Sequence, residues 1–400
     1  MKRLFGFKGS FVHYILFSLF FLALFNSPLV GVSFYVLLFC LFSVLICWTK
    51  TYFDKTSVYL LLFSISYPLI LWMNSGKFNP HYLLYLIAPI TFYVWGQYIV
   101  TKINNQRGLL NFLLLVLIFF AAQTYLITIE DVKEIGLINP MRTMLREGEE
   151  EAKINATLFG LNVSLGLSGL AIFMALKNKF GSIRGFLFLG VFLLSLLTVI
   201  HLINRTGIVV AVFCTFCSYI YSVRNNGKIL NAILKIFLIM AIVLFLISLF
   251  SKNGFDIIEA YTNRSSTENT SISDYGDRSW RWLDAMGRLF TNPFGWNNEV
   301  KYNFVHNLWL DVAMFAGIIP FIFIVCATIR SLKQLFQLMK HNNDIIVHSI
   351  FSLSICFILS SFVEPVMVGF DPYFYLYCMI WGIQKKYIEY TESGIILFNE

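Results

Sequence analysis

Charged residues are scarce in this sequence, and their scarcity excludes water as the main solvent of the folded chain. Asp, Glu, Lys and Arg make up 13% of the 400 residues and hydrophobic residues make up 58%, whereas a soluble domain carries about 25% charged residues. The mean hydropathy is +0.72. The composition therefore predicts a protein that lies mostly within a lipid bilayer.

Cysteine is also scarce, and it is missing from the polar loops. All seven cysteines lie inside apolar runs, so the sequence does not indicate the disulfide framework that stabilises small secreted domains. Cys214 and Cys217 form a Cys-x-x-Cys pair. Because this pair lies within an apolar run, we interpret both residues as packing residues.

Motifs for nucleotide and metal chemistry are missing as well. The sequence has no Gly-rich loop that would cradle phosphates, no His-Glu-x-x-His and no Asp-x-Asp pair. Each of these motifs supplies donors or ligands that nucleotide-dependent or metal-dependent enzymes need. We therefore expect no nucleotide, metal or other cofactor.

Apolar runs long enough to cross a bilayer recur along the chain. A helix needs about 20 apolar residues to span the roughly 30 Å of hydrocarbon. The runs predict an all-α, polytopic integral membrane protein that forms a single membrane domain, 1–400, with about twelve spans. They lie at 11–26, 30–48, 57–73, 81–100, 109–129, 156–176, 185–203, 206–223, 229–250, 305–329, 345–363 and 372–384.

The basic residues indicate how these spans are oriented. If the N-terminus is cytoplasmic, only Lys77 and Arg205 among the basic residues of short connections lie on the outer side. The positive-inside rule then predicts that both termini are cytoplasmic, with a first outer loop at 130–155 and a large periplasmic loop at 251–304. The net charge of +8 would then face anionic lipid headgroups rather than nucleic acid.

One basic residue, Arg205, lies where a positive charge is unfavourable. Asn204-Arg205-Thr206 separates two apolar runs with almost no loop between them, so the guanidinium must lie at or just below the outer interface. An arginine at the bilayer centre costs about 2.5–3.5 kcal/mol on insertion scales. Either an anionic ligand compensates the charge of Arg205, or its side chain reaches lipid phosphates.

The stretch DRSWRWLDAMGRLFTNPFGW, at 277–296, is typical of a short amphipathic helix that ends at Asn292-Pro293. Helical spacing puts three arginines on one face and an apolar set on another, as in a helix lying in the membrane interface. These are Arg278, Arg281 and Arg288, and Trp282, Met286, Leu289 and Phe290. The arginines face lipid phosphates, or they bind a pyrophosphate through the planar fork of the guanidinium.

His306 and Asn307 stand immediately before the tenth apolar run, at its outer end. Histidine titrates near neutral pH and can take a proton from a sugar hydroxyl, but at a helix start it can equally serve as a hydrogen-bonding residue. Asp311 follows one turn later, where an intramembrane acid most simply forms an interhelical hydrogen bond. Glu364 and Asp371 bracket the last outer turn, and the spacing does not select between these two acids.

Three of these segments resemble the bacterial O-antigen polymerase and O-antigen ligase superfamily. They are NRTGIVVAVF at 204–213, DRSWRWLDAMGRLFTNPFGW at 277–296 and HNLWLDVAMFAGIIPF at 306–321, with the long outer loop before the last of them. The resemblance covers about the C-terminal half of the chain. The N-terminal half is similar in hydropathy only.

The resemblance implies a metal-independent glycosyltransferase of the bacterial inner membrane, with an active site that faces the periplasm. Its substrate would be an oligosaccharide linked to undecaprenyl pyrophosphate, and its partners would be membrane lipids and a chain-length regulator. The resemblance implies pyrophosphate binding by Arg205 and Arg278 and catalysis by His306, and the arginine face adds Arg281. Asn307, Asp311 and Glu364 are expected to support the site.

Polymerase and ligase differ in the acceptor, which is a fresh lipid-linked repeat unit for the polymerase and lipid A-core for the ligase. The short gap between NPFGW and His306 favours the polymerase, because ligases often carry a longer insertion there. A polysaccharide or lipid transporter is the alternative from another class. Transporters tend to place polar residues at the bilayer midplane of paired repeats, whereas here these residues lie at one membrane edge.

Overall fold

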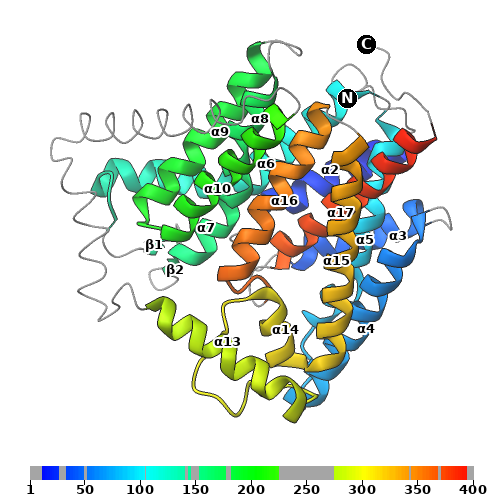
Figure 1. The fold of residues 1–400 in the computed structure, drawn as a ribbon, viewed down its shortest axis with the longest axis vertical. Helices are drawn as coiled ribbons and strands as arrows, with labels where there is room; N and C mark the ends of the chain where they lie inside the picture. The colour runs from blue at the N-terminus through cyan, green and yellow to red at the C-terminus, as the bar shows by residue number, and fades with distance from the viewer. Residues whose placement is uncertain are drawn as a thin grey trace.

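The computed structural model describes residues 11–26, 33–48, 52–103, 105–139, 143–145, 153–176, 182–224, 274–341, 344–367 and 371–393. Within these ranges the chain is a bundle of helices (Figure 1) with one small antiparallel hairpin, in which β1 (Thr143–Leu145) pairs with β2 (Lys153–Asn155). The bundle interior is a continuous cluster of buried apolar side chains. The architecture therefore agrees with the predicted all-α class.

Eight helical segments in the described part of the chain are long and apolar enough to cross a bilayer. They are α4 (Lys55–Ser75), α5 (Tyr82–Lys102), α6 (Gln106–Ile135), the run Ala156–Leu176, α9 (Ser182–His201), α10 (Arg205–Val223), α15 (Ile318–His341) and α16 (Ile345–Val363). The run Ala156–Leu176 consists of α7 (Ala156–Ser164), the 3₁₀ turn η2 (Leu165–Ser168) and α8 (Gly169–Leu176). The remaining bundle helices are α2 (Phe11–Asn26), α3 (Ser33–Cys47) and α17 (Asp371–Glu392). The protein is a polytopic membrane protein.

The predicted tenth span, 305–329, is not one helix. A short helix, α14 (Leu308–Ala316), ends at Gly317, and α15 starts at the next residue. Gly317 has a φ of 78°, and a Cβ on it would lie 1.9 Å from the carbonyl oxygen of Pro293. The turn after α13 (Asp274–Thr291) therefore packs directly against this break, which only glycine allows.

Two other predicted segments differ from the structure or lie outside it. The helix predicted at 109–129 continues as α6 to Ile135, because the carboxylate of Asp131 finds buried partners in the side chains of His201 and Asn139. The first outer loop, predicted from 130, thus begins as helix. The predicted ninth span, 229–250, falls outside the described residues.

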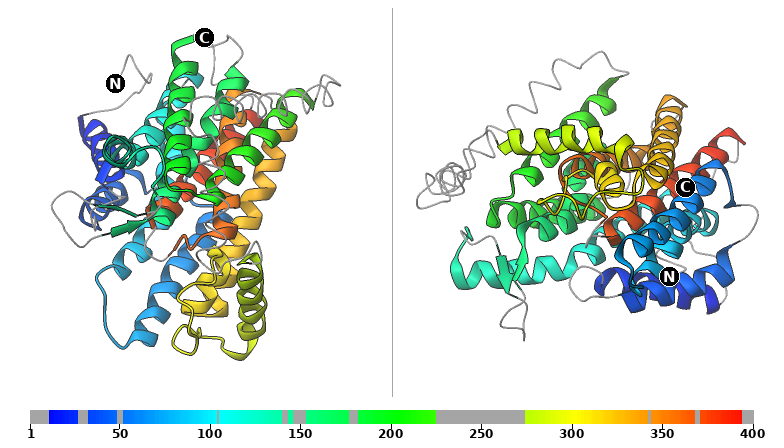
Figure 2. Two further views of the ribbon diagram at one scale, coloured as in Figure 1. Left: turned by 90° about the vertical axis from the view of Figure 1, so that its left-hand side faces the viewer. Right: turned by 90° about the horizontal axis from the view of Figure 1, so that it is seen from below.

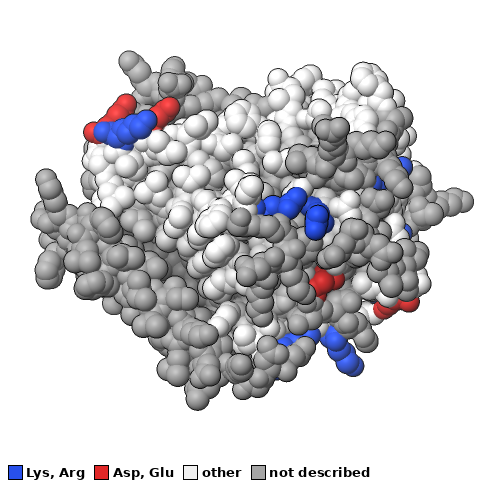
Figure 3. All heavy atoms as spheres, turned by 90° about the horizontal axis from the view of Figure 1, so that it is seen from above, with Lys and Arg blue, Asp and Glu red and all other residues white. Residues whose placement is uncertain are grey.

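The helix ends gather at two opposite faces of the bundle. At one face Tyr52 bonds to Thr101 at 3.1 Å and Arg184 bonds to Asn111 at 2.8 Å. Figure 3 shows Lys and Arg side chains on this face, together with some Asp and Glu side chains. We call this end the basic face.

The opposite end carries α13, α14 and the tip of α4, as Figures 1 and 2 both show. There the side chain of Asn74 donates hydrogen bonds to the carbonyl oxygens of Phe294 and Phe315, at 2.7 and 3.1 Å. All the predicted site residues belong to this end, which we call the site face.

Two glycines let α5 and α17 approach each other at backbone distance. A Cβ on Gly96 would lie 2.1 Å from the carbonyl oxygen of Met379, and a Cβ on Gly382 would lie 1.9 Å from that of Tyr93. Close approach through small residues is a main source of packing energy between membrane helices, because lipid and helix surfaces are equally apolar. This crossing places the start of α17 beside the start of α5 at the site face.

The change Gly382→Ala should destabilise the protein by about 1–3 kcal/mol, since the added methyl group forces the two backbones apart. Gly190→Ala is the matched control, because a Cβ on Gly190 would meet nothing within 4 Å. The midpoint of thermal unfolding in detergent measures both effects. Equal midpoints for the two variants would show that the crossing is not tightly packed.

Candidate functional site

The C-terminal end of α16 is where three distant segments of the chain meet. Arg278 of α13 donates a hydrogen bond to the carbonyl oxygen of Val363 at 2.8 Å. The hydroxyl of Thr206, at the start of α10, donates to Oε1 of Glu364 at 2.8 Å. The imidazole Nδ1 of His306 lies 3.9 Å from Oε2 of the same carboxylate. Glu364 and the carbonyl before it thus join α10, α13 and the loop before α14.

Glu364 and His306 face each other with hydrogen-bonding capacity unused. Glu364 is 6% exposed, and among the described residues neither its Oε2 nor the Nδ1 of His306 has a hydrogen-bond partner. Buried polar atoms are nearly always hydrogen-bonded, so two unbonded ones side by side call for an explanation. Catalytic hydrogen bonds are often long before substrate binds, and the 3.9 Å separation fits that pattern.

Strained backbone occurs next to two of the predicted site residues. In the described ranges Ile203 and His306 are the only residues other than glycine with positive φ, at 49° and 61°. Such conformations cost about 1–3 kcal/mol and persist where surrounding contacts hold them, often at functional sites. The chain is therefore held in an unfavourable conformation at His306 and two residues before Arg205.

Asp311 holds the strained turn at His306. Its carboxylate accepts hydrogen bonds from the backbone nitrogens of Val305 at 2.6 Å and of Asn307 at 3.1 Å, on either side of His306. Asn307 caps α14 by accepting from the nitrogen of Leu310 at 3.2 Å. Both residues therefore position His306 rather than reach outwards.

Asn204 orients the start of α10. Its Oδ1 accepts a hydrogen bond from the nitrogen of Gly207 at 3.0 Å, and its Nδ2 donates to the carbonyl oxygen of Ala156 at 3.1 Å. This capping fixes the first turn of α10, in which Arg205 and Thr206 are half-buried and the hydroxyl of Thr206 reaches Glu364 at the end of α16. Asn204, Thr206 and Glu364 line a narrow cavity, whose lining does not include Arg205, Arg278 or His306.

The arginines of α13 have three different environments. Arg278 reaches the end of α16. Arg281 donates to the carbonyl oxygen of Phe304 at 3.2 Å and lies over the ring of Tyr302, so it supports the loop that leads to His306. Arg288 forms ion pairs with Asp284 at 3.0 Å and Glu299 at 3.3 Å. Arg278 is thus the arginine of this helix that contacts the end of α16.

The apolar surface of α13 differs from the predicted one. Trp282 and Leu289 pack inwards against the loop 300–305 and α14, because the indole of Trp282 bonds to the carbonyl oxygen of Val305 at 3.1 Å. The exposed apolar side chains of the helix are Trp280, Leu283, Met286 and Phe290. An amphipathic helix of this kind suits the membrane interface.

The structure shows that Glu364 and Asp371, which the sequence did not distinguish as candidate site acids, have different partners. Glu364 faces His306, whereas the carboxylate of Asp371 hydrogen-bonds to the imidazole of His81 and to the hydroxyl of Tyr85. The hydrogen bond that the imidazole of His81 donates to Asp371 favours the protonated ring and raises the pKa of His81. His81 was missed in the sequence because its partner lies 290 residues away.

Comparison with known proteins adds no relative: no family model matches the chain and no curated protein matches it significantly. The motifs at 204–213, 277–296 and 306–321 thus remain the basis of the family resemblance, and the structure contributes their arrangement in space.

The change Thr206→Val should destabilise the protein by about 1–3 kcal/mol, since it leaves a buried carboxylate oxygen of Glu364 without its donor. Thr206→Ser keeps the hydroxyl and should retain wild-type stability. Thermal unfolding in detergent compares the two variants. If both lowered the midpoint equally, the hydroxyl would not be what links α10 to Glu364.

Proposed function

We propose that this protein is an O-antigen polymerase, which transfers a glycan from undecaprenyl pyrophosphate to a lipid-linked repeat unit. The observation that supports the proposal is the meeting of Arg278, His306, Thr206 and Glu364 at the end of α16. These residues come from the three segments that resemble the family and from the last outer turn. Their meeting brings a cation, an imidazole and a carboxylate to one membrane edge.

The cationic groups suit a diphosphate leaving group. Arginine has five N–H donors in a planar fork that matches phosphate oxygens, and the hydrogen bond from Arg278 to Val363 uses one of them. In the proposed reaction Arg278 and Arg205 bind the pyrophosphate and stabilise the negative charge that develops on it. Arg281 keeps the adjacent loop in place.

His306 and Glu364 suit the acceptor. In the proposed transfer the bond between the donor sugar carbon and the pyrophosphate oxygen breaks, and a bond from that carbon to the acceptor hydroxyl oxygen forms. The proton of the hydroxyl goes to His306, and the carboxylate of Glu364 stabilises the resulting imidazolium. The donor is already activated, so positioning and charge stabilisation are the remaining demands on the protein.

The orientation in this proposal follows from charge. The basic face carries Lys and Arg side chains (Figure 3), and the positive-inside rule favours a cytoplasmic position for it. The site face would then lie at the periplasmic surface of the inner membrane. The apolar side chains of α13 would rest in the outer leaflet beside the lipid carrier.

Deleting the gene and complementing the deletion with variants tests this function. Arg278→Ala and His306→Ala should abolish polymer while protein remains in the membrane, leaving lipopolysaccharide with a single repeat unit on a gel. Lys301→Ala is the matched control, because Lys301 is an exposed cation of the same region, and it should give normal chains.

Two other results would contradict the proposal. A bare core without any repeat unit in the deletion strain would indicate a ligase instead. Normal chain length in both the Arg278 and the His306 variants would refute the proposed site.

A further inference from the structure

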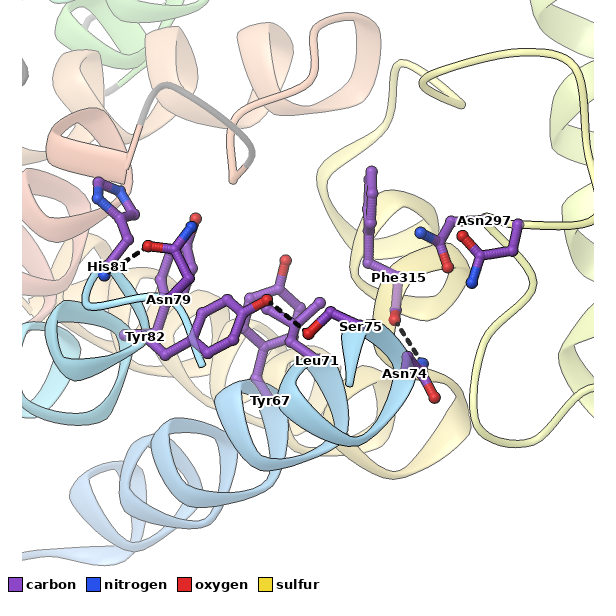
Figure 4. Close-up of a pocket in the computed structure, with 11 residues that line it drawn as sticks. Tyr67, Leu71, Asn74, Ser75, Asn79, His81, Tyr82, Asn297 and Phe315 are labelled. Atoms are coloured by element: carbon purple, nitrogen blue, oxygen red, sulfur yellow. Dashed lines mark hydrogen bonds between the residues drawn. The ribbon is translucent and has the colours of Figure 1, made fainter. Parts of the chain in front are cut away.

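A second cavity lies at the site face, outside the residues assigned above. It has a volume of about 440 Å³ and is formed by the tip of α4, the connection to α5, the loop after α13 and the end of α14. Ligand pockets typically have about 300–1,000 Å³. Figure 4 shows Phe315 and Asn297 on one side of the cavity and His81 and Asn79 on the other.

Most residues that line this cavity have a polar group on the side chain, although rings and other apolar atoms form the larger part of its surface, and none of them is lysine or arginine. It consists of Tyr67, Leu71, Asn74, Ser75, Asn79, His81, Tyr82, Tyr85, Asn297, Asn298 and Phe315. Amide and hydroxyl groups both donate and accept hydrogen bonds, as the hydroxyls of a neutral sugar require. A phosphate would find no guanidinium or ammonium group among these side chains, in contrast to the surroundings of Arg278.

Three polar groups of the lining have no partner within the described part of the protein. The side-chain amides of Asn297 and Asn298 make no hydrogen bond there, and the hydroxyl of Tyr67, a fully buried residue, has none either. Asn297 is half-buried and Asn298 is exposed, so both amides are open to a ligand, whereas the hydroxyl of Tyr67 is enclosed by protein. A ligand with hydroxyl groups can exchange hydrogen bonds with the two asparagine amides.

The backbone that carries the two asparagines is held firmly. The nitrogens of Trp296 and Asn297 both donate to the carbonyl oxygen of Met314, at 2.8 and 3.1 Å, and the side chain of Trp296 is 1% exposed. Gly295 before them has a φ of 103°. A backbone anchored in this way lowers the cost of ordering the loop when a ligand binds.

The ring of Phe304 lies between the cavity wall and His306. The ring of Phe315, in the cavity wall, lies 6.4 Å from that of Phe304, which in turn lies 6.2 Å from the imidazole of His306. On the other side, His81 binds Asp371, seven residues after Glu364 in the chain. A glycan chain could therefore extend from the reacting centre into the cavity.

We infer that this cavity binds neutral sugar rings of the glycan substrate, with Asn297 and Asn298 donating and accepting hydrogen bonds to the sugar hydroxyls. The inference rests on the proposed function, since it supplies a glycan subsite for that enzyme. It assigns the glycan to this cavity, whose lining has no lysine or arginine, and the pyrophosphate to Arg278 and Arg205.

Saturation-transfer NMR on the purified full-length protein in detergent tests the inference. The probe is the phosphate-free repeat-unit oligosaccharide, released by mild acid from the lipid-linked fraction of the cells that carry the gene. The double variant Asn297→Ala/Asn298→Ala should bind it about tenfold more weakly than wild type, because two hydrogen-bonding side chains are lost.

Asn303→Ala is the matched control, because Asn303 is an exposed asparagine of the same loop that does not line the cavity. This variant should bind like wild type. Thermal unfolding should give wild-type midpoints for all variants. If the double variant has a lower unfolding midpoint than wild type, the single variant Asn298→Ala replaces it in the binding measurement, since Asn298 is exposed.

The outcomes separate this inference from the proposed function. No saturation transfer to the probe from wild type, or equal transfer from wild type and the double variant, would overturn the glycan subsite. Loss of probe binding in Arg278→Ala would also overturn it, because the sugar would then be held at the arginine. If Arg278→Ala cells made normal polymer while probe binding still depended on Asn297 and Asn298, the polymerase proposal would fail and the subsite would stand.

Discussion

A buried carboxylate at the end of a membrane helix must be hydrogen-bonded or paired with a cation, because an isolated charge in a medium of low dielectric constant is very costly. Glu364 meets this requirement through Thr206 on one oxygen and faces His306 with the other. Its position therefore determines where the start of α10 and the loop before α14 lie. Arg278 binds the carbonyl oxygen of the preceding residue, which adds α13 to the same point.

The rest of the bundle keeps this point at one membrane edge. The glycine crossing of α5 and α17 brings Asp371 to His81 at the site face. Asp311 braces the backbone on either side of His306, and Asn204 caps α10 beside Thr206. Each of these polar contacts lies at a helix end, where the backbone needs capping partners. In the described part of the chain, Glu364 Oε2 and His306 Nδ1 are two neighbouring buried atoms at this site without a hydrogen-bond partner.

Hydropathy predicts most helices of this chain because one physical requirement, an apolar surface of bilayer length, decides them. As predicted, α2 covers 11–26 and α16 covers 345–363. The break at Gly317 could not be foreseen, since that glycine stands within an apolar run and its role comes from contact with Pro293. Helical spacing grouped Trp282 with Met286, but the loop that covers Trp282 is not visible in the periodicity.

The candidate site was accessible from the sequence only in part. Residue chemistry singled out Arg205, Arg278 and His306, because cations and an imidazole at a membrane edge are unusual. The choice between Glu364 and Asp371 depends on contacts across more than a hundred residues, and spacing carries no information on them. Asn297 and Asn298 were missed because polar residues in a loop are ordinary; their position in a cavity is what distinguishes them.

A cryo-EM structure of the protein with a bound polyprenyl pyrophosphate measures the central claim most directly. We expect the diphosphate within hydrogen-bonding distance of Arg278 and Arg205, at the end of α16 and beside His306 and Glu364, with the polyprenyl chain running into the bilayer. A diphosphate bound elsewhere, with Arg278 still bonded to Val363 and His306 remote from the ligand, would contradict the account.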